Sequence, residues 1–492
     1  MATFYVANFG CRATQADGAA IERQLRERGL ERAEEPANAE LVVLNTCTVT
    51  TAADQDARAA IRRIHRKNPD AQIVVTGCYA QRAPEEVAAL PGVTQVIGNS
   101  HQHQLAELAG FGRQPSDRGL RLVNRDCQTD PPLAGFVPIT QLTPDVPGPK
   151  SDARSPIFVS DIFAHTELQA APVCDAANER TRPNLKVQDG CDNRCSFCVI
   201  PYVRGQSRSL QLAEVIREVR TLVTAGYREV VISGINLGRW GRDLAFSPQP
   251  PALGKTAQRP TTNNQPPSFE DLVRAILSET TLEKLRISSV EPMDWSDELI
   301  QMMAQSPRIA KHAHLPLQSG SDAVLRRMHR KYRPWHYREK IEKIRTALPT
   351  AAVGADVMVG FPGETEAEFE ETRRLVADLP FTYLHVFTYS ARPGTPAASV
   401  GKQVPVGVAR ERNRILRDLA AEKKLAFMSG FIGKPVELIT LNVTGSDHEG
   451  KYTEGLTDNY LPVCLQGNHP PNRWILARVE SVSHGALLGI AS

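Results

Sequence analysis

The chain has 492 residues, of which 41% are hydrophobic and 23% are charged, and its formal net charge is +3. These values are ordinary for a globular protein of roughly two to four domains, and the overall charge gives no sign of a nucleic-acid partner. No run of about 18 apolar residues predicts a membrane span, and the N-terminal residues lack the basic start and apolar core of a secretory signal. Nine cysteines, an odd number, argue against a disulfide framework and favour a reducing cytoplasm in which thiols bind metal.

Strand and helix patterns alternate at the start of the chain. We expect strands over residues 3–10, 41–46 and 73–77, separated by helices over about 15–28 and 52–67. Continuous apolar strands that alternate with helices predict a parallel α/β sheet, in which the carboxyl ends of the strands share one edge. Each strand ends at a cysteine, and these are Cys11, Cys47 and Cys78. The functional interpretation is a metal cluster with three protein ligands and one free iron; the alternative is three unrelated buried cysteines.

The next part of the chain carries few structural signals. Residues 113–155 are rich in Pro, Gly, Ser and Asp, which predicts a linker or a loop-rich insertion. A short strand is expected over residues 159–162, ahead of a central domain. Cys127 and Cys174 have no partner at a ligand spacing, so we interpret both as structural or incidental.

A second group of cysteines follows an expected strand over residues 185–188. Cys191, Cys195 and Cys198 have the spacing C-x3-C-x2-C, which suits a soft metal or an iron–sulfur cluster. A [4Fe–4S] cluster usually takes four cysteines, so three leave one iron open to a small chelating ligand. Phe197 is expected to lie over such a cluster. The alternative is a zinc knuckle, but tetrahedral zinc needs a fourth ligand and no Cys or His lies close by in sequence.

Strands and helices then alternate six times, which predicts an open (β/α)6 barrel. The expected strands cover residues 185–188, 229–233, 284–289, 312–315, 353–359 and 383–389. In such barrels the reacting groups lie at the carboxyl ends of the strands. The candidate residues there are Ser233, Gly234, Glu291, Gln318 and Asp356. Residues 240–267 interrupt the pattern and are expected to form a disordered surface insertion.

A basic stretch and a change of pattern end the chain. Residues 324–345 contain nine Lys or Arg against Glu339 and Glu342, with Tyr332, Trp335 and Tyr337 between them. Cations with interleaved aromatic rings favour RNA binding, and the alternative is a solvated helix face. A helix is expected over residues 407–431, and short strands after it predict a small β-barrel. That tail has four basic and six acidic residues, so we expect the stretch 324–345 to contribute more RNA affinity.

The cysteine stretch 186–198 resembles the radical S-adenosylmethionine (SAM) enzymes. This resemblance implies a [4Fe–4S] cluster whose free iron chelates SAM, and one electron from the cluster cleaves SAM to a 5′-deoxyadenosyl radical. Gly10-Cys11, Asn45–Thr50 and Gly77–Gln81 resemble the N-terminal domain of the methylthiotransferases, which implies an auxiliary [4Fe–4S] cluster for sulfur insertion. The tail resembles the TRAM domain that ends these enzymes.

The resemblance implies four regions and a function. The regions are an N-terminal methylthiotransferase domain (1–112), a linker or insertion (113–182), a radical SAM domain (183–431) and a TRAM-like β-barrel (432–492). We expect methylthiolation of carbon 2 of N6-threonylcarbamoyladenosine at tRNA position 37. The six cluster cysteines would hold two [4Fe–4S] clusters, with Cys191, Cys195 and Cys198 in the catalytic one. The strand-end residues Ser233, Gly234, Glu291, Gln318 and Asp356 would bind SAM.

The expected partners are a tRNA anticodon loop, an electron donor protein and a sulfur donor, and we expect a cytoplasmic monomer without membrane contact. The substrate alternatives are N6-isopentenyladenosine in tRNA and an aspartate of a ribosomal protein. Thr14 and Ala16 stand where the threonylcarbamoyladenosine class commonly has Asn and Tyr, and Cys11 is intact. A non-catalytic iron–sulfur RNA-binding protein is the alternative from another class, although pure electron carriers normally saturate their irons.

Overall fold

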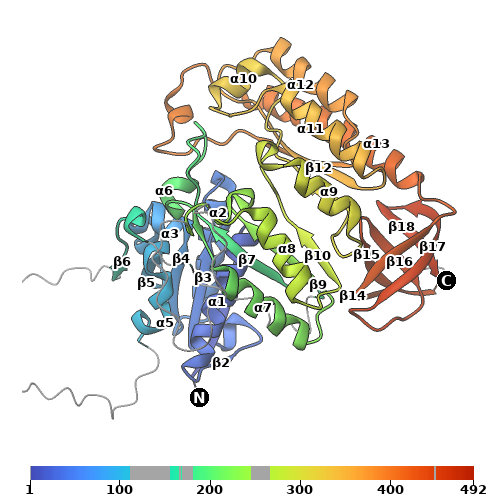
Figure 1. Ribbon diagram of the computed structural model, residues 1–492. Coiled ribbons are helices and arrows are strands. Elements are labelled where there is room, and N and C mark those ends of the chain that lie inside the picture. Colours follow the sequence, from blue (N-terminus) through green and yellow to red (C-terminus); the bar gives the residue numbers. More distant parts are fainter. Residues whose placement is uncertain (1, 111–155, 166–167, 169–180, 245–265, 448–449) are drawn as a thin grey trace, which may run out of the picture.

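The computed structural model describes residues 2–110, 156–165, 168, 181–244, 266–447 and 450–492 (Figure 1). Within these residues the strands form a six-stranded sheet, a four-stranded sheet, a three-stranded sheet and a closed five-stranded barrel. The expected linker 113–155, Cys127, Cys174 and most of the expected insertion 240–267 lie outside the described residues. No described helix is long and apolar enough to cross a membrane.

The N-terminal sheet is parallel throughout, as the alternation of strands and helices predicts. Its strands, in spatial order, are β2 (Glu31–Arg32), β1 (Thr3–Asn8), β3 (Leu41–Thr46), β4 (Gln72–Gly77), β5 (Val93–Gly98) and β6 (Ile157–Phe158). Alternate residues of these strands are buried in two cores, one on each face. Helices α1 (Arg12–Glu27) and α5 (Leu105–Leu108) cover one face, and the other is covered by α2 (Thr51–Lys67), α3 (Cys78–Arg82) and α4 (Pro84–Ala88).

The expected strand over residues 159–162 is wrong by a few residues. The strand there is β6 (Ile157–Phe158), and it joins the N-terminal sheet beside β5. The chain then turns into a short 3-10 helix, Ile162–Ala164, because the Asp161 side chain accepts a hydrogen bond from the backbone N–H of Phe163.

The six predicted central strands are all observed, as parallel neighbours in two sheets. One sheet contains β8 (Arg208–Ser209), β7 (Asn184–Asp189), β9 (Glu229–Gly234) and β10 (Lys284–Ile287), with β8 antiparallel to β7. The other contains β11 (His312–His314), β12 (Ala352–Val359) and β13 (Tyr383–Thr388). Isolated parallel bridges, Leu285 with Ile309 and Ser289 with His314, connect the two sheets between β10 and β11.

Helices cover the outer face of the central sheets. They are α7 (Leu212–Thr224), α8 (Phe269–Glu279), α9 (Asp297–Gln305), α10 (Asp322–Arg327), α11 (Pro334–Ala347), α12 (Glu366–Asp378) and α13 (Val406–Ser429). The short helix α6 (Ile200–Arg204) instead packs against Cys78 of the N-terminal domain. Capping boxes begin two of them, Ser268 with Asp271 at α8 and Thr365 with Glu368 at α12.

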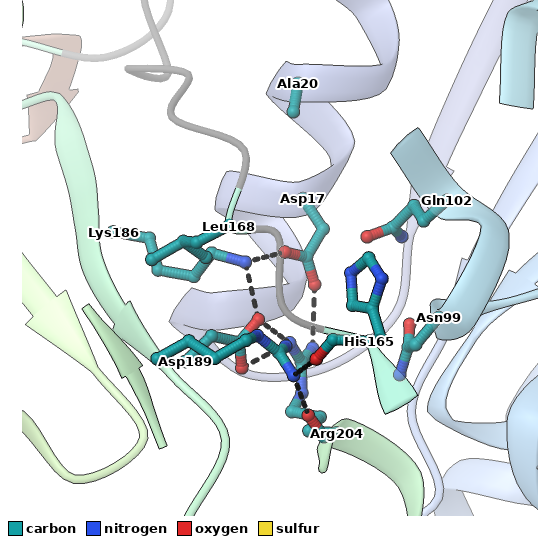
Figure 2. Close-up of a pocket in the computed structure, with 10 residues that line it drawn as sticks. Asp17, Ala20, Asn99, Gln102, His165, Leu168, Lys186, Asp189 and Arg204 are labelled. Atoms are coloured by element: carbon teal, nitrogen blue, oxygen red, sulfur yellow. Dashed lines mark hydrogen bonds and ion pairs between the residues drawn. The ribbon is translucent and has the colours of Figure 1, made fainter. Parts of the chain in front are cut away.

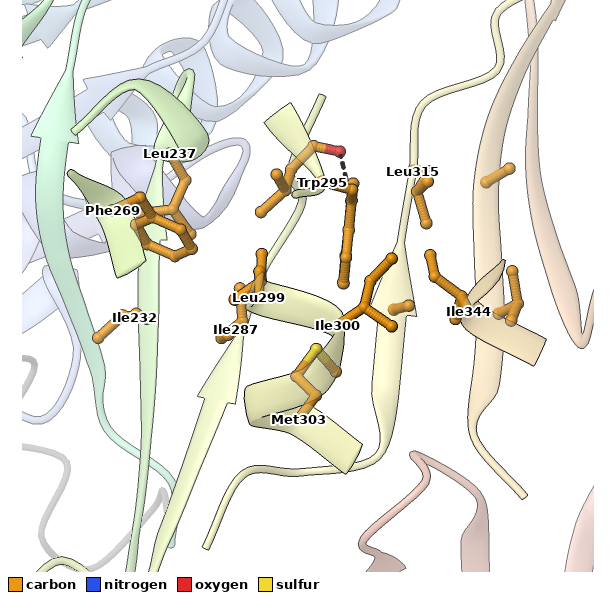
Figure 3. Close-up of a cluster of buried hydrophobic side chains, with 14 of the residues drawn as sticks. Ile232, Leu237, Phe269, Ile287, Trp295, Leu299, Ile300, Met303, Leu315 and Ile344 are labelled. Carbon is orange, nitrogen blue, oxygen red and sulfur yellow. Dashed lines mark hydrogen bonds between the residues drawn. The ribbon is translucent and has the colours of Figure 1, made fainter. Parts of the chain in front are cut away.

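One large core lies between these helices and the strands (Figure 3). Trp295 is fully buried in it, and its indole N–H donates to the Val290 carbonyl oxygen at 3.2 Å. The strands contribute Ile232, Ile287 and residues that follow β11, such as Leu315. This packing fixes the strand ends that carry the candidate site.

The C-terminal strands form a closed barrel in the order β14, β15, β16, β18, β17. Their bounds are β14 (Pro435–Asp447), β15 (Gly450–Thr457), β16 (Pro462–Gln466), β17 (Trp474–Ser483) and β18 (Ala486–Ala491). The alternating inward residues of these strands form a small separate core. The strand β18 was not predicted, and it completes the barrel by pairing with both β16 and β17.

Candidate active site

Three adjacent parallel strands bring Cys11, Cys47 and Cys78 to one edge of the N-terminal sheet. Cys11 caps α1 after β1, Cys47 directly follows β3, and Cys78 begins α3 after β4. Strand register aligns the ends, because Asn8 pairs with Asn45 and Thr46 pairs with Gly77. Cys47 and Cys78 are buried, whereas Cys11 is exposed.

Two glycines make this approach of the cysteines sterically feasible. Gly77 has φ +95°, and a Cβ there would lie 2.3 Å from the Thr46 carbonyl oxygen. Gly10 has φ +134°, and a Cβ there would lie 2.5 Å from the Cβ of Cys47. Both the backbone conformation and the space therefore require glycine beside the cysteines.

The charges of the three thiols act on one another. The pKa of Cys78 is raised to about 12: burial is the main cause, Cys47 and Cys11 add to it, and Arg204 opposes it. Burial also raises the pKa of Cys47, again with a contribution from Cys11. Thiols with raised pKa values are stable as protonated groups or as ligands of a cation, since metal binding replaces their protons.

The second cysteine group forms the loop after β7. The backbone N–H of Cys191 donates to the Gly205 carbonyl oxygen at 3.1 Å, and that of Cys198 donates to the Cys195 carbonyl oxygen at 3.1 Å. Two side chains donate to the sulfurs: Asn236 Nδ2 lies 3.7 Å from Cys191 Sγ, and Arg330 Nη1 lies 3.4 Å from Cys195 Sγ. The pKa of Cys198 is raised to about 12, mainly by burial and in smaller part by Cys195 and Cys191.

This donor set fits an iron–sulfur cluster. Three thiolates supply the ligands, and the amide of Asn236 and the guanidinium of Arg330 are donors of the kind that tune such sulfurs. Glu291 forms an ion pair with Arg330 and so fixes its orientation. Phe197 is half-buried beside the loop and packs edge-on against Phe361, with ring centroids 6.5 Å apart.

A chamber of about 480 Å³ lies between the three parts of the molecule. Cys11 and Arg12 of the N-terminal domain line it, as does Tyr460 of the C-terminal barrel. The central strands contribute Ser233, Gly234, Ser288, Ser289, His312, His314, Asp356, Tyr383 and His385. Ile200, two residues after Cys198, also lines it, so the chamber extends from Cys11 toward the second cysteine loop.

The chamber contains three of the five strand-end residues predicted to bind SAM. These are Ser233, Gly234 and Asp356. Glu291 and Gln318 are not among the lining residues: Glu291 pairs with Arg330, and Gln318, at φ +63°, exchanges backbone hydrogen bonds with β12. The structure therefore separates two of the five from the chamber surface.

Sequence reasoning missed the inward side chains of β11 and β13. His312 and His314 alternate on β11, and Tyr383 and His385 alternate on β13. His312 Nε2 lies 2.7 Å from the Tyr383 hydroxyl, and His314 Nδ1 lies 3.0 Å from the Ser289 hydroxyl. The period-two spacing of polar rings in otherwise apolar strands was the available signal. Within the described chain, His314, Asp356 and His385 are a trio whose ligand atoms all lie within 4.8 Å of one another.

Two family models match this chain. Residues 3–98 match "Uncharacterized protein family UPF0004" and residues 185–376 match "Radical SAM superfamily". The threonylcarbamoyladenosine tRNA methylthiotransferase MtaB of Bacillus subtilis is 34% identical over 95% of this chain and 91% of its own length. The chain belongs to the radical SAM methylthiotransferase family. This methylthiotransferase is therefore an enzyme of a family that uses a [4Fe–4S] cluster and SAM.

Other relatives and a solved structure are also similar to this methylthiotransferase. The tRNA-2-methylthio-N(6)-dimethylallyladenosine synthase of Novosphingobium aromaticivorans is 32% identical over 89% of this chain and 86% of its own length. The radical SAM methyltransferase TsrM of Kitasatospora setae matches with a TM-score of 0.51 and 15% identity, covering 81% of this chain and 74% of that one. The TsrM likeness shows the fold alone.

The basic stretch 324–345 of this methylthiotransferase is mostly committed to internal contacts. Tyr332 and Tyr337 are buried, so they cannot stack on RNA bases, and Trp335 is 56% exposed. Arg330 is 7% exposed beside the second cysteine loop. Eight of the nine cations have an internal partner: Arg326, Arg327, Arg330, Arg333, Arg338, Lys340, Lys343 and Arg345. The interleaved aromatic pattern was a core pattern, and the expectation of an RNA-stacking surface is wrong for Tyr332 and Tyr337.

A buried ion-pair network fixes the N-terminal domain against the central one (Figure 2). Asp17 on α1 pairs with Lys186 on β7 and with Arg204 on α6, the latter at 2.7 Å. Asp189 accepts from the same two cations, at 2.8 Å from Lys186 and 3.0 Å from Arg204. All four side chains are buried and their charges sum to zero, so the network positions Cys11 relative to the cysteine loop after β7.

Proposed function

We propose that the protein methylthiolates carbon 2 of N6-threonylcarbamoyladenosine at position 37 of tRNA. The B. subtilis relative that carries this substrate in its name is similar along 95% of the chain. The observation that supports the chemistry best is that one chamber is lined by Cys11 and extends to Ile200 beside the second cysteine loop. A methylthio transfer needs a site that activates carbon and a site that supplies sulfur, and one enclosed space must reach both.

The cysteines and strand ends take separate roles in this proposal. Cys191, Cys195 and Cys198 would hold the cluster that binds SAM, and Cys11, Cys47 and Cys78 would hold the auxiliary [4Fe–4S] cluster. When bound, the first cluster and SAM supply a 5′-deoxyadenosyl radical, and the second carries the sulfur to be transferred. The chain's own contribution is to enclose the chamber and to hold the two cysteine groups at fixed positions relative to each other through the Asp17 network.

The SAM contacts follow from the chamber lining. Gly234 allows close approach of the adenine, and the Asp356 carboxylate suits the ribose hydroxyls or the ammonium group. Ser233 lies beside them at the end of β9. For Glu291 and Gln318 the proposal rests on their place at the strand ends alone.

We also infer the finer architecture. The strand order and the bridges between β10 and β11 support an open (β/α)6 barrel within residues 183–431. The five-stranded barrel within 432–492 would be a TRAM-like domain that contacts the anticodon loop. Residues 1–112 would form the methylthiotransferase domain and 113–182 the linker. An electron donor protein and a sulfur donor complete the set of partners, and the chain would act as a cytoplasmic monomer.

One second candidate has a specific observation behind it. A relative named for dimethylallyladenosine is 32% identical over 89% of the chain, close to the value for the threonylcarbamoyladenosine relative. That candidate places an apolar N6 substituent in the same chamber. The threonylcarbamoyl group carries a carboxylate and the dimethylallyl group is neutral. A polar chamber wall therefore favours the first substrate, and an apolar wall favours the second.

Mass spectrometry of tRNA nucleosides tests the function. Cells that lack the protein should lose 2-methylthio-N6-threonylcarbamoyladenosine and accumulate its precursor, and the wild-type gene should restore the product. Anaerobically reconstituted protein should also form 5′-deoxyadenosine from SAM. Loss of the dimethylallyl product instead would establish the second candidate, and intact clusters without 5′-deoxyadenosine would point to a binding protein.

A further inference from the structure

Arg12 is a cation at the chamber wall without a carboxylate partner. It is the first residue of α1, directly after Cys11, and its backbone carbonyl accepts from Asn184 Nδ2 at 2.9 Å. Its guanidinium donates to the Tyr460 hydroxyl at 3.2 Å. Among the described residues no carboxylate forms an ion pair with Arg12, which is the one arginine that lines the chamber. The charge is therefore available to a ligand.

The position of Arg12 is fixed from two sides. Asn184 on β7 holds its backbone, and Tyr460 holds its head group. Tyr460 itself has φ +67°, a conformation that a non-glycine residue adopts only at a cost. That turn aims its ring at the chamber, where it packs on His312 with ring centroids 4.6 Å apart. A guanidinium held in this way loses little conformational entropy when it binds an anion.

The charge of Arg12 acts on the inward faces of both β11 and β13. Burial lowers the pKa of His312, and Arg286, His314 and Arg12 lower it further. Burial also lowers the pKa of His385, again with a contribution from Arg12. His314 Nε2 lies 3.5 Å from an Asp356 carboxylate oxygen, and His312 Nε2 lies 2.7 Å from the Tyr383 hydroxyl, so both rings belong to the polar lining of the chamber. The chamber thus presents a cation together with polar imidazole rings.

We propose that Arg12 binds the carboxylate of the threonylcarbamoyl group, with His312, His314 and His385 as polar partners for its hydroxyl and urea groups. This subsite rests on the proposed function and deepens it, because it explains the choice between the two tRNA substrates. A guanidinium binds a carboxylate through charge-assisted hydrogen bonds. A dimethylallyl group has no polar atoms, so it would leave Arg12 desolvated and without an anionic partner.

Binding measurements with anticodon stem-loop RNA test the subsite. The probes are one RNA sequence with N6-threonylcarbamoyladenosine, its methyl ester, N6-dimethylallyladenosine or unmodified adenosine at the same position. Full-length protein with reconstituted clusters should bind the acid about tenfold more tightly than the ester, since one charge-assisted contact is removed. Arg12→Gln should abolish this preference, and Arg12→Lys should keep part of it.

The control is Arg217→Gln, which removes an exposed arginine on α7, outside the chamber. It should leave the preference for the acid over the ester unchanged.

The proposal is overturned if Arg12→Gln keeps the preference, or if it weakens the binding of all four RNAs equally, which would make Arg12 a phosphate contact. It is also overturned if the variant changes only the absorption and electron paramagnetic resonance spectra of the auxiliary cluster, which would assign Arg12 to the thiolates. If the wild type methylthiolates the threonylcarbamoyl RNA yet binds acid and ester equally, the subsite alone fails. If it does not methylthiolate that RNA, the proposed function fails.

Discussion

At the scale of single residues, the position of each cysteine group depends on a few neighbouring residues that are not cysteines. Gly10 and Gly77 allow the backbone to pass close to Cys47 and Thr46, and a Cβ at either position would overlap its neighbour. Arg330 offers a hydrogen bond to Cys195 from a buried position that Glu291 stabilises. The ligands are therefore placed by sterics at one site and by electrostatics at the other.

Replacement of Cys11, Cys47 and Cys78 by Ser should separate the two cysteine groups. Iron content should fall from about eight to about four atoms per chain, because one of two four-iron clusters is lost. The variant should still form 5′-deoxyadenosine but no methylthiolated nucleoside. Cys464→Ser, in the C-terminal barrel, is the matched control and should keep all the iron. Unchanged iron in the triple variant would refute an auxiliary cluster at these cysteines.

Replacement of Arg330 by Gln should reduce the free energy of unfolding by roughly 3 kcal/mol, because Glu291 loses its partner in a partly buried position. Urea titration under anaerobic conditions measures the change. Adding Glu291→Gln to the variant should recover part of the loss. Arg326→Gln, at an exposed ion pair with Asp322, should change stability by less than about 1 kcal/mol. If Arg330→Gln and Arg326→Gln reduce the free energy of unfolding equally, the buried ion pair of Arg330 with Glu291 does not contribute more than an exposed one.

At the scale of elements, most of the fold was predictable and part of the site was not. The strands β3, β9 and β12 agree with prediction within two residues, because their apolar runs are buried on both faces. The strands β5 and β18 were missed, since polar residues and glycine interrupt their apolar pattern.

The cysteines were predictable because each follows a strand or falls in one short loop. The inward rings of β11 and β13 were not, since their meaning depends on pairing through β12, where His314 aligns with Gly354 and Gly354 aligns with Tyr383. Tyr460 could not be placed at all, because it reaches the chamber from a different domain. The basic stretch misled for the same reason: burial, which sequence does not show, decided what its arginines contact.

Gly354 tests the register of these three strands. A Cβ at this position would lie 2.1 Å from Cζ of Tyr383, whose hydroxyl is held by His312 at 2.7 Å. Gly354→Ala should therefore destabilise the protein by about 1–3 kcal/mol in urea titration, because the ring cannot move without losing its hydrogen bond. Gly401→Ala is the matched control, since a Cβ there meets no atom within 4 Å. If Gly354→Ala leaves the free energy of unfolding unchanged, the Tyr383 ring is not fixed in this position.

At the scale of the whole molecule, the N-terminal domain spans the gap between the first and last central strands. Its α1 contacts β7 through the Asp17 network, and the start of α2 contacts the segment after β13. There Asp54 forms an ion pair with Arg392 at 2.6 Å, and both side chains are buried. The domain that carries Cys11 thus forms one wall of the chamber and places the cysteine in it.

The C-terminal barrel closes the chamber from another side, through the turn between β15 and β16. Arg286 on β10 is fully buried and donates to the carbonyl oxygens of Thr457 and Asp458 in this turn. The same guanidinium pairs with Glu229 on β9, also fully buried, at 2.6 Å. One arginine therefore connects two central strands to the turn that presents Tyr460.

Arg286→Met should both destabilise the protein and loosen the C-terminal barrel. The free energy of unfolding should fall by about 3–5 kcal/mol, because Glu229 is left as a buried charge without its hydrogen-bonded partner, and Arg182 and Lys284 act on it only from farther away. Limited proteolysis should cut sooner between α13 and β14, since the turn loses two hydrogen bonds. Adding Glu229→Gln should restore much of the stability but not the protease resistance. Full recovery of both would show that the turn does not depend on Arg286.

The pH dependence of the protein's stability gives an independent test of the ion pair between Glu229 and Arg286. Burial favours the neutral form of Glu229, but Arg286 and Arg182 outweigh it and lower the pKa of the carboxyl group. A lowered pKa stabilises the fold above the unfolded value of about 4.3, and this contribution is lost as the pH falls through the folded pKa. The stability difference between wild type and Glu229→Gln should therefore stay constant from about pH 8 to pH 6 and shrink below about pH 4. A difference that shrinks between pH 8 and 6 would mean that the carboxyl group is protonated near neutrality, and that the turn carrying Tyr460 is held without this ion pair.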